Sequence, residues 1–114
     1  NTGYSRKIAE GLLEKLDWQV GRDIDALVTA DDVARNRPHP DMIQFAMDKF
    51  GITDPATVVK VGDSAIDIEE GFNAGCTVSI GITTGAHTVE QLQQVHPTCI
   101  INDLKELETI VRPG

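Results

Sequence analysis

The stretch Val58-Val59-Lys60-Val61-Gly62-Asp63-Ser64-Ala65-Ile66-Asp67 decides the fold of this 114-residue chain. Its first half is rich in β-branched residues, which is typical of a short buried strand, and its second half begins a helix. The strand ends in Gly-Asp at Asp63, and Asp67 follows four residues later in the first turn of the helix. Two carboxylates at this point offer the hard oxygen ligands that Mg²⁺ prefers. A structural interpretation stands beside this one, because Ser64 and Asp67 can form a capping box and Asp63 can close an Asx turn.

Strands and helices alternate on both sides of this stretch. Apolar periodicity predicts helices at 5–16, 40–50, 65–74, 88–95 and 103–111. Short apolar runs predict strands at 26–29, 57–61, 77–80 and 99–101. Such alternation predicts an α/β fold with a doubly wound parallel sheet of the Rossmann-like kind, in which ligands bind at the carboxyl ends of the strands.

The composition is that of an ordinary globular domain. With 114 residues and 40% hydrophobic content, the chain is long enough for one modest domain and too short for two. Its formal net charge of −8 argues against a nucleic-acid partner, because a phosphate backbone requires a basic surface. No apolar run approaches the roughly 20 residues that a membrane span needs. Cys76 and Cys99 match no zinc-binding spacing and have apolar neighbours, which suits free thiols in a reducing cytoplasm.

Two further segments carry groups that can bind an anion. In Arg37-Pro38-His39-Pro40, a guanidinium stands beside a rigid proline just before a helix and can pair with two phosphate oxygens. The alternative is a surface arginine in a proline-bounded turn. In Asn1-Thr2-Gly3, a hydroxyl and backbone N–H groups at the entry to a helix can hold an anion, although the same residues also serve simple capping.

These segments occur in the order found in the haloacid dehalogenase-like superfamily, which the chain resembles along essentially its whole length. Within that superfamily it is similar to the phosphonoacetaldehyde hydrolase-like branch. The resemblance rests on Thr-Gly at a helix entry, an arginine in place of the more usual lysine, and Gly-Asp-Ser-x-x-Asp followed by further glycines. The segments concerned are Asn1-Thr2-Gly3-Tyr4-Ser5-Arg6, Arg37-Pro38-His39-Pro40, Val61-Gly62-Asp63-Ser64, Gly71-Phe72-Asn73-Ala74-Gly75 and the stretch 81–87.

The resemblance implies roles for five residues. Thr2, with Gly3 beside it, falls on the family's second motif, whose hydroxyl binds the phosphoryl group. Arg37 falls on the third motif and would engage the same group. Asp63 and Asp67 fall on the fourth motif, the first as a Mg²⁺ ligand and the second as a ligand or supporting acid. A cation and a guanidinium would together offset the charge on a phosphoryl group in transfer.

One part of the family pattern does not occur in these 114 residues. The family's first motif, a strand ending Asp-x-Asp, supplies the nucleophile and the general acid/base, and it precedes the second motif. Asp31-Asp32 lacks that position and spacing, so we interpret both acids as loop residues. The cap domain that this branch inserts between the first two motifs does not occur either. We therefore expect residues 1–114 to be the C-terminal portion of one core domain, incomplete without its N-terminal strand and cap.

The resemblance therefore implies a Mg²⁺-dependent phosphohydrolase, of phosphatase or phosphonatase type, that acts on a small phosphorylated or phosphonate metabolite through an aspartyl-phosphate. The nucleophile would lie outside this chain, so the N-terminal segment becomes a necessary partner and the chain alone is expected to be inactive. Two alternatives stay open. The isolated chain can be a non-catalytic fragment or a subunit that awaits complementation, and the alternation by itself also fits a flavodoxin-like binding domain. We expect neither nucleic acid nor a membrane as a partner.

Overall fold

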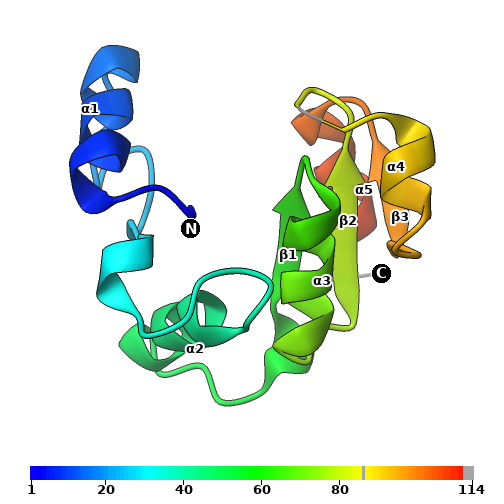
Figure 1. The fold of residues 1–114 in the computed structure, drawn as a ribbon, viewed down its shortest axis with the longest axis horizontal. Coiled ribbons are helices and arrows are strands. Elements are labelled where there is room, and N and C mark those ends of the chain that lie inside the picture. Colours follow the sequence, from blue (N-terminus) through cyan, green and yellow to red (C-terminus); the bar gives the residue numbers. More distant parts are fainter. Residues whose placement is uncertain (86, 112–114) are drawn as a thin grey trace. The chain divides into compact units, whose positions relative to one another are not determined.

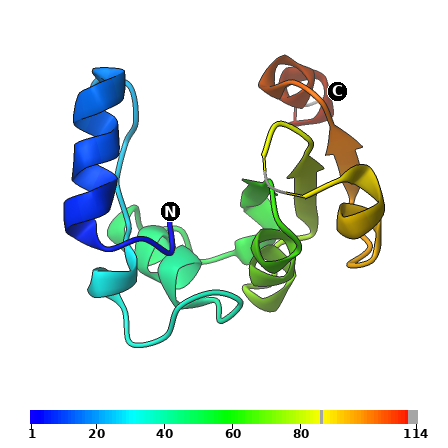
Figure 2. The same cartoon turned by 45° about the horizontal axis from the view of Figure 1, so that its top comes forward.

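The computed structural model describes residues 1–85 and 87–111 (Figure 1, Figure 2). Ala86, which falls in the 81–87 stretch, lies outside the described residues, and so do residues 112–114 and the side chain of Val111. The chain divides into two compact units, Asn1–Thr53 and Asp54–Gly114. Among the described residues, no helix has both the length and the apolar character needed to cross a bilayer.

The second unit is built on a parallel sheet that has three strands among the described residues. The strands are β1 (Val59–Gly62), β2 (Val78–Ile82) and β3 (Cys99–Ile101), in the order β1-β2-β3. Val59 pairs with Val78 at the start of the register. Helix α3 (Ala65–Asn73) connects β1 to β2 and packs on both (Figure 1), and α4 (Val89–Gln93) connects β2 to β3. The predicted α/β fold with a parallel sheet is confirmed.

Helices cover both faces of this sheet, because alternate residues of a strand point to opposite sides. On one face, a Cβ at Gly81 would touch Ile68 of α3 and Leu92 of α4. On the opposite face, the fully buried Ile80 belongs to an isoleucine cluster, and Leu107 of α5 (Leu107–Val111) packs against that cluster. The sheet is therefore doubly wound, as the sequence predicts.

Helix α3 lies close enough to the sheet to bury an ion pair. Lys60 Nζ of β1 lies 3.0 Å from Glu70 Oε1 of α3, and the two side chains are 9% and 0% exposed. Gly71 permits this approach, since a Cβ there would overlap Ser79 Oγ of β2 and come within 2.7 Å of Lys60 Cβ. Ser79 Oγ in turn donates to the Ile68 carbonyl oxygen at 2.9 Å. Polar side chains of β1 and β2 therefore stand beneath α3, inside the unit.

Helices α1 (Arg6–Leu16) and α2 (Asp41–Lys49) belong to the first unit. The Ser5 side chain caps α1, and Pro40 precedes α2 at the cap, one position earlier than predicted. Gly51 follows the end of α2 with a φ of +67°, a left-handed conformation that glycine adopts without strain. The predictions of both helices are confirmed.

The prediction of a strand at 26–29 is wrong. Val28 and Thr29 are buried, but the described residues form no strand there. The Thr2 N–H donates to the Val28 carbonyl oxygen at 3.0 Å and the Ala30 N–H donates to the Tyr4 carbonyl oxygen at 3.1 Å. These two bonds do not make the regular ladder that defines a strand. Beyond them, Thr29 begins the 3₁₀ turn η1 (Ala30–Asp32).

Several other boundaries differ from the predicted ones, two of them because a short 3₁₀ turn precedes the element. The turn η2 (Pro55–Thr57), capped by Asp54, delays the start of β1 to Val59. The turn η3 (Leu104–Glu106), capped by Asp103, precedes α5. Helix α4 ends at Gln93 instead of reaching residue 95. The order and type of these elements agree with the sequence prediction.

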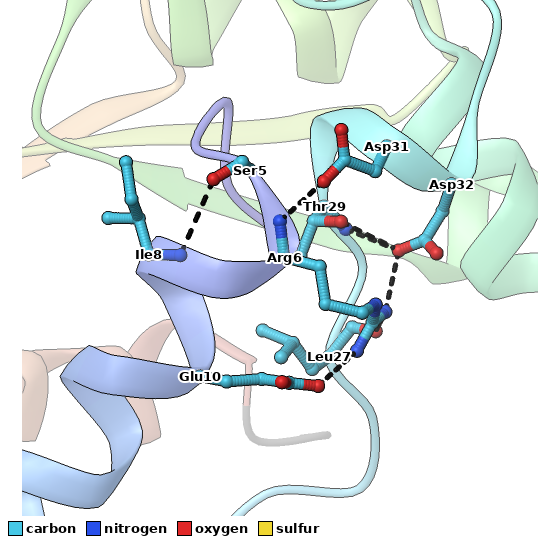
Figure 3. A network of polar contacts seen from close by, with 8 residues as sticks. All are labelled: Ser5, Arg6, Ile8, Glu10, Leu27, Thr29, Asp31 and Asp32. Carbon is cyan, nitrogen blue, oxygen red and sulfur yellow. Dashed lines mark hydrogen bonds and ion pairs between the residues drawn. The ribbon is translucent and has the colours of Figure 1, made fainter.

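Asp31 and Asp32 hold the first turn of α1 in place (Figure 3). The Arg6 N–H donates to Asp31 Oδ2 at 2.7 Å. The Arg6 guanidinium donates to Asp32 Oδ2 at 2.7 Å and to the Leu27 carbonyl oxygen at 3.2 Å. Asp32 Oδ2 also accepts from the Thr29 N–H at 2.7 Å and from its hydroxyl at 3.0 Å, as Figure 3 shows. Both acids therefore have structural partners in a loop, in agreement with their interpretation from the sequence.

The free energy of unfolding should decrease at acid pH because Asp32 becomes protonated there. The Thr29 amide, followed by the Arg6 guanidinium, holds the pKa of the Asp32 carboxyl below its usual range. Because the folded pKa lies below the unfolded value of about 3.9, the stabilisation is complete above that value and is lost as the pH falls through the folded pKa. Urea unfolding should therefore show the largest gap between wild type and Asp32→Asn above about pH 5, and a shrinking gap below it. A gap that stays constant across this range would contradict the assignment.

Candidate functional site

Arg37, Asn36 and Gly3 form a cluster in the first unit. The Arg37 guanidinium lies against Gly3, since a Cβ at that glycine would come within 2.9 Å of Nη2 and 3.2 Å of Cζ. Asn36 Nδ2 donates to the Gly3 carbonyl oxygen at 3.3 Å, and Asn36 Oδ1 accepts from the Arg37 N–H at 2.7 Å. The Arg37-Pro38 peptide bond is cis. The structure thus brings the predicted Thr2-Gly3 segment to the predicted arginine across 33 residues of sequence.

Thr2 is not the cap of α1. Its Oγ1 accepts from the Tyr4 N–H at 3.2 Å, before the helix begins. The first amides of α1 are served instead by Ser5, which accepts from Ile8 N–H, and by the carboxylate of Asp31. A helix start usually attracts anions through such amides. The Thr2 hydroxyl and the Arg37 fork are of a kind that can donate to a phosphoryl group.

Asp63 stands directly after β1, in a loop where two glycines make room. A Cβ at Gly62 would overlap Asp67 Cβ, so only glycine lets the first turn of α3 pack on the end of the strand. A Cβ at Gly85 would overlap the Asp63 carboxylate in the same way. The Asp63 side chain is therefore enclosed by backbone on one side and is half-buried.

Asp67 forms the capping box that the sequence suggests. Its Oδ2 accepts from the Ser64 N–H at 3.3 Å and from Ser64 Oγ at 2.9 Å, and Ser64 Oγ accepts from the Asp67 N–H at 3.4 Å. Only 7% of Asp67 is exposed. This carboxylate holds the loop that carries Asp63, whatever further role it has.

His87 also contacts this loop, a contact that the sequence did not predict, since residue 87 entered only as the end of the stretch 81–87. The imidazole Nδ1 accepts from the Ala65 N–H at 3.0 Å, and the backbone N–H of His87 donates to the Asp63 carbonyl oxygen at 3.3 Å. The sequence offered one clue to this contact. His87 comes directly before Thr88 in the loop that follows β2, and β2 lies next to β1. That signal is weak, because it says nothing about which helix start the imidazole reaches.

The donor set around Asp63 fits a hard divalent cation. Within residues 1–85 and 87–111, no three His, Cys, Asp or Glu side chains gather as a metal-binding group. Mg²⁺ does not require such a group, since it commonly binds through one or two carboxylates and completes its shell with water and substrate phosphate oxygens. Asp63 and Asp67, both carboxylates at the carboxyl end of β1, meet that requirement in kind.

The five residues singled out from the sequence divide between the units. Thr2, Gly3 and Arg37 belong to the first unit, where Gly3 and Arg37 are in contact. Asp63 and Asp67 belong to the second, where both stand at the start of α3. The first unit therefore carries groups that can donate hydrogen bonds to an anion, and the second carries carboxylate oxygens that can bind a cation.

The chain is similar to known hydrolases along most of its length. Residues 1–82 match the family described as haloacid dehalogenase-like hydrolase. The chain is 44% identical over 81 residues to a phosphonoacetaldehyde hydrolase from Latilactobacillus sakei subsp. sakei (strain 23K), covering 71% of this chain and 30% of that protein. It is 33% identical over 96 residues to a phosphoglycolate phosphatase from Escherichia coli (strain K12), covering 84% of this chain and 36% of that protein. The chain thus spans about a third of the length of these curated relatives.

A solved structure agrees with the sequence relatives. A haloacid dehalogenase-like hydrolase from Bacteroides fragilis matches the chain with a TM-score of 0.78 at 26% identity, over 94% of this chain and 49% of that one. The parallel sheet, the flanking helices and the match over residues 1–82 lead to one assignment. This chain belongs to the haloacid dehalogenase-like hydrolase family.

Proposed function

We propose that the protein carrying this chain is a Mg²⁺-dependent phosphohydrolase that acts on a small phosphorylated or phosphonate metabolite. The observation that carries the proposal is the contact between the Arg37 guanidinium and Gly3, because a guanidinium beside the Thr2 segment can donate to two phosphate oxygens. Membership of a hydrolase family supports the reaction type. The names of the relatives, a phosphonoacetaldehyde hydrolase and a phosphoglycolate phosphatase, support the substrate class.

Each residue has a defined task in this proposal. The Thr2 hydroxyl and the Arg37 fork bind phosphoryl oxygens, and the Gly3 backbone leaves room for the guanidinium. Asp63 would hold Mg²⁺ directly, and Asp67 would either join it or keep the loop in position through Ser64. Bound Mg²⁺ supplies positive charge that stabilises the phosphoryl oxygens during transfer.

The phosphorylated aspartate of this mechanism would come from the family's Asp-x-Asp motif, outside these 114 residues. Asp31 and Asp32 support this view, because each carboxylate already accepts hydrogen bonds that fix the start of α1. The proposal therefore includes the segment with that motif as a necessary partner. Turnover of p-nitrophenyl phosphate by the purified 114-residue chain alone, free of contaminating phosphatase, would refute this part.

Arg37→Lys in the full-length protein should lower kcat/KM for p-nitrophenyl phosphate by roughly ten- to a hundredfold, or about 1.4 to 2.7 kcal/mol. Lysine keeps the charge but loses the planar fork that engages two oxygens. Arg35→Lys is a matched control, since Arg35 forms an exposed ion pair with Asp41 at 2.9 Å. The control should change the kinetics by less than about twofold, because Arg35 donates to the Asp41 carboxylate and has no task in the proposed site. Equal effects of the two substitutions would remove Arg37 from the site.

Gly3→Ala tests the same contact from its other side. A methyl group at this position would displace the end of a flexible arginine side chain, so the fold should survive while the guanidinium moves. The loss in kcat/KM should approach that of Arg37→Lys, and the double variant should lose little more, since both changes disturb one contact. Full additivity of the two losses would contradict the coupling.

We also propose a reducing, cytoplasmic setting for the protein. Cys76 is buried, Cys99 is half-buried, and both are free thiols. Burial raises the pKa of both thiols above the ordinary value, which lowers their reactivity. Fractionation of cells that produce the full-length protein tests this setting.

A further inference from the structure

We propose that His87 is a positioning residue, which holds the Asp63 loop in the geometry that binds Mg²⁺. The proposal rests on the function proposed above, in which Asp63 is a metal ligand. In this proposal His87 acts through the backbone of residues 63 to 65, to which it makes two hydrogen bonds.

The first step of the argument concerns the start of α3. Ala65 is the first residue of the helix, so its N–H has no acceptor within the helix. The local capping box of Ser64 and Asp67 serves other groups, namely the amides of those two residues. The Ala65 amide is served instead by Nδ1 of His87, 22 residues further along the chain, at 3.0 Å.

The second step is that His87 fixes the same loop at a second point. Its backbone N–H donates to the Asp63 carbonyl oxygen at 3.3 Å. Gly85, two residues earlier, lies so close to the Asp63 carboxylate that a Cβ would overlap it. The segment around residues 85 and 87 therefore contacts Asp63 at its side chain and its carbonyl group, and contacts Ala65 at its amide.

The third step links this contact to metal binding. Mg²⁺ requires nearly ideal octahedral geometry at short distances, so a small displacement of a carboxylate ligand lowers affinity. Groups that orient the ligands of a metal are commonly worth ten- to a hundredfold in affinity. Loss of the imidazole acceptor would leave the Ala65 amide without this partner and would let the turn that carries Asp63 relax.

Three substitutions of His87 in the full-length protein distinguish a role in positioning the Asp63 loop from an effect of side-chain size or of overall protein stability. His87→Asn supplies an Oδ1 acceptor near the position of the imidazole Nδ1, whereas His87→Gln carries its acceptor one bond further out. His87→Ala removes the acceptor altogether. Two readouts apply to each variant: the Mg²⁺ dissociation constant by calorimetry without substrate, and hydrogen–deuterium exchange of the Ala65 amide by NMR.

We expect His87→Ala and His87→Gln to weaken Mg²⁺ binding by about ten- to a hundredfold and to speed Ala65 exchange by at least about tenfold. His87→Asn should restore both values to within about threefold of wild type. Faster Ala65 exchange together with unchanged Mg²⁺ affinity would overturn the proposal, and so would equal affinities for His87→Asn and His87→Gln. If His87→Ala does not fold, the comparison of the other two variants decides the question.

The outcome also separates this proposal from the proposed function. If Asp63 is not a metal ligand, the wild-type protein and Asp63→Ala will bind Mg²⁺ equally, whatever His87 does. If Asp63 is a ligand but His87 is not a positioning residue, Asp63→Ala will lose affinity while His87→Ala keeps it. The first result refutes the function together with this inference, and the second refutes this inference alone.

Discussion

Asp63→Ala in the full-length protein should lower kcat/KM for Mg²⁺-dependent hydrolysis of p-nitrophenyl phosphate by about a thousandfold or more. A metal that stabilises a phosphoryl group contributes several kcal/mol, and a thousandfold corresponds to about 4 kcal/mol. Asp63 follows β1 at the carboxyl end of the sheet, where parallel sheets bind their ligands, and its carboxylate lies against Gly85. The Mg²⁺ dissociation constant should rise in parallel.

Asp103→Ala provides the matched control for this experiment. Asp103 lies two residues after β3, near the same edge of the sheet, and its carboxylate caps the short turn η3 by accepting from the Lys105 N–H at 2.9 Å. Its removal costs the cap of η3, typically about 1 kcal/mol of stability, and should leave the kinetics within about twofold of wild type. Wild-type turnover by Asp63→Ala would remove the proposed metal role.

Glu70→Ala should destabilise the protein by about 3 to 5 kcal/mol. This change leaves Lys60 as a buried charge without the carboxylate that lies 3.0 Å from its Nζ, and breaking a buried pair on one side has costs of this order. Glu69→Ala is the control, since Glu69 is the neighbouring residue of α3 and is exposed. That change should alter the free energy of unfolding by less than about 0.5 kcal/mol in urea titrations.

The double variant Lys60→Met, Glu70→Leu tests the cause of this loss. If the loss arises from an unpaired buried charge, apolar residues of similar volume at both positions should recover most of the stability. If the double variant is as unstable as Glu70→Ala, the pair stabilises the protein in another way. An effect of Glu70→Ala no larger than that of Glu69→Ala would contradict the burial of the pair.

The features of the fold that the sequence predicted correctly depend on residues that are close together in the sequence. The capping box of α3 joins Ser64 to Asp67 within three residues, and it forms as the sequence suggested. Gly75 follows α3 with a φ of +93°, a conformation for which glycine is the usual choice. The prediction of a strand at 26–29 was wrong because it depends on residues far away in the chain. Whether an apolar run becomes a strand depends on a neighbouring strand, and its own residues do not contain that information.

The candidate site was predictable as a set of residues but not as a set of contacts. Chemistry-bearing side chains such as Arg37 and Asp63 are visible in the sequence because they stand beside proline and glycine at the ends of elements. The contact of Arg37 with Gly3 and that of His87 with Ala65 join residues far apart in the chain, and no local pattern indicates either. The burial of Lys60 and Glu70 was not predictable either. Charged residues are rarely fully buried unless they are paired, and the sequence does not show that these two residues pair.

The strand order β1-β2-β3 has a practical consequence for production of the chain. Among the strands that the structure describes, β1 stands at the edge of the sheet, paired with β2 alone. Amides and carbonyl groups along such an edge can recruit a strand from another molecule, and Val59 in β1 is 37% exposed. The 114-residue chain expressed by itself is therefore prone to self-association through this edge of the sheet.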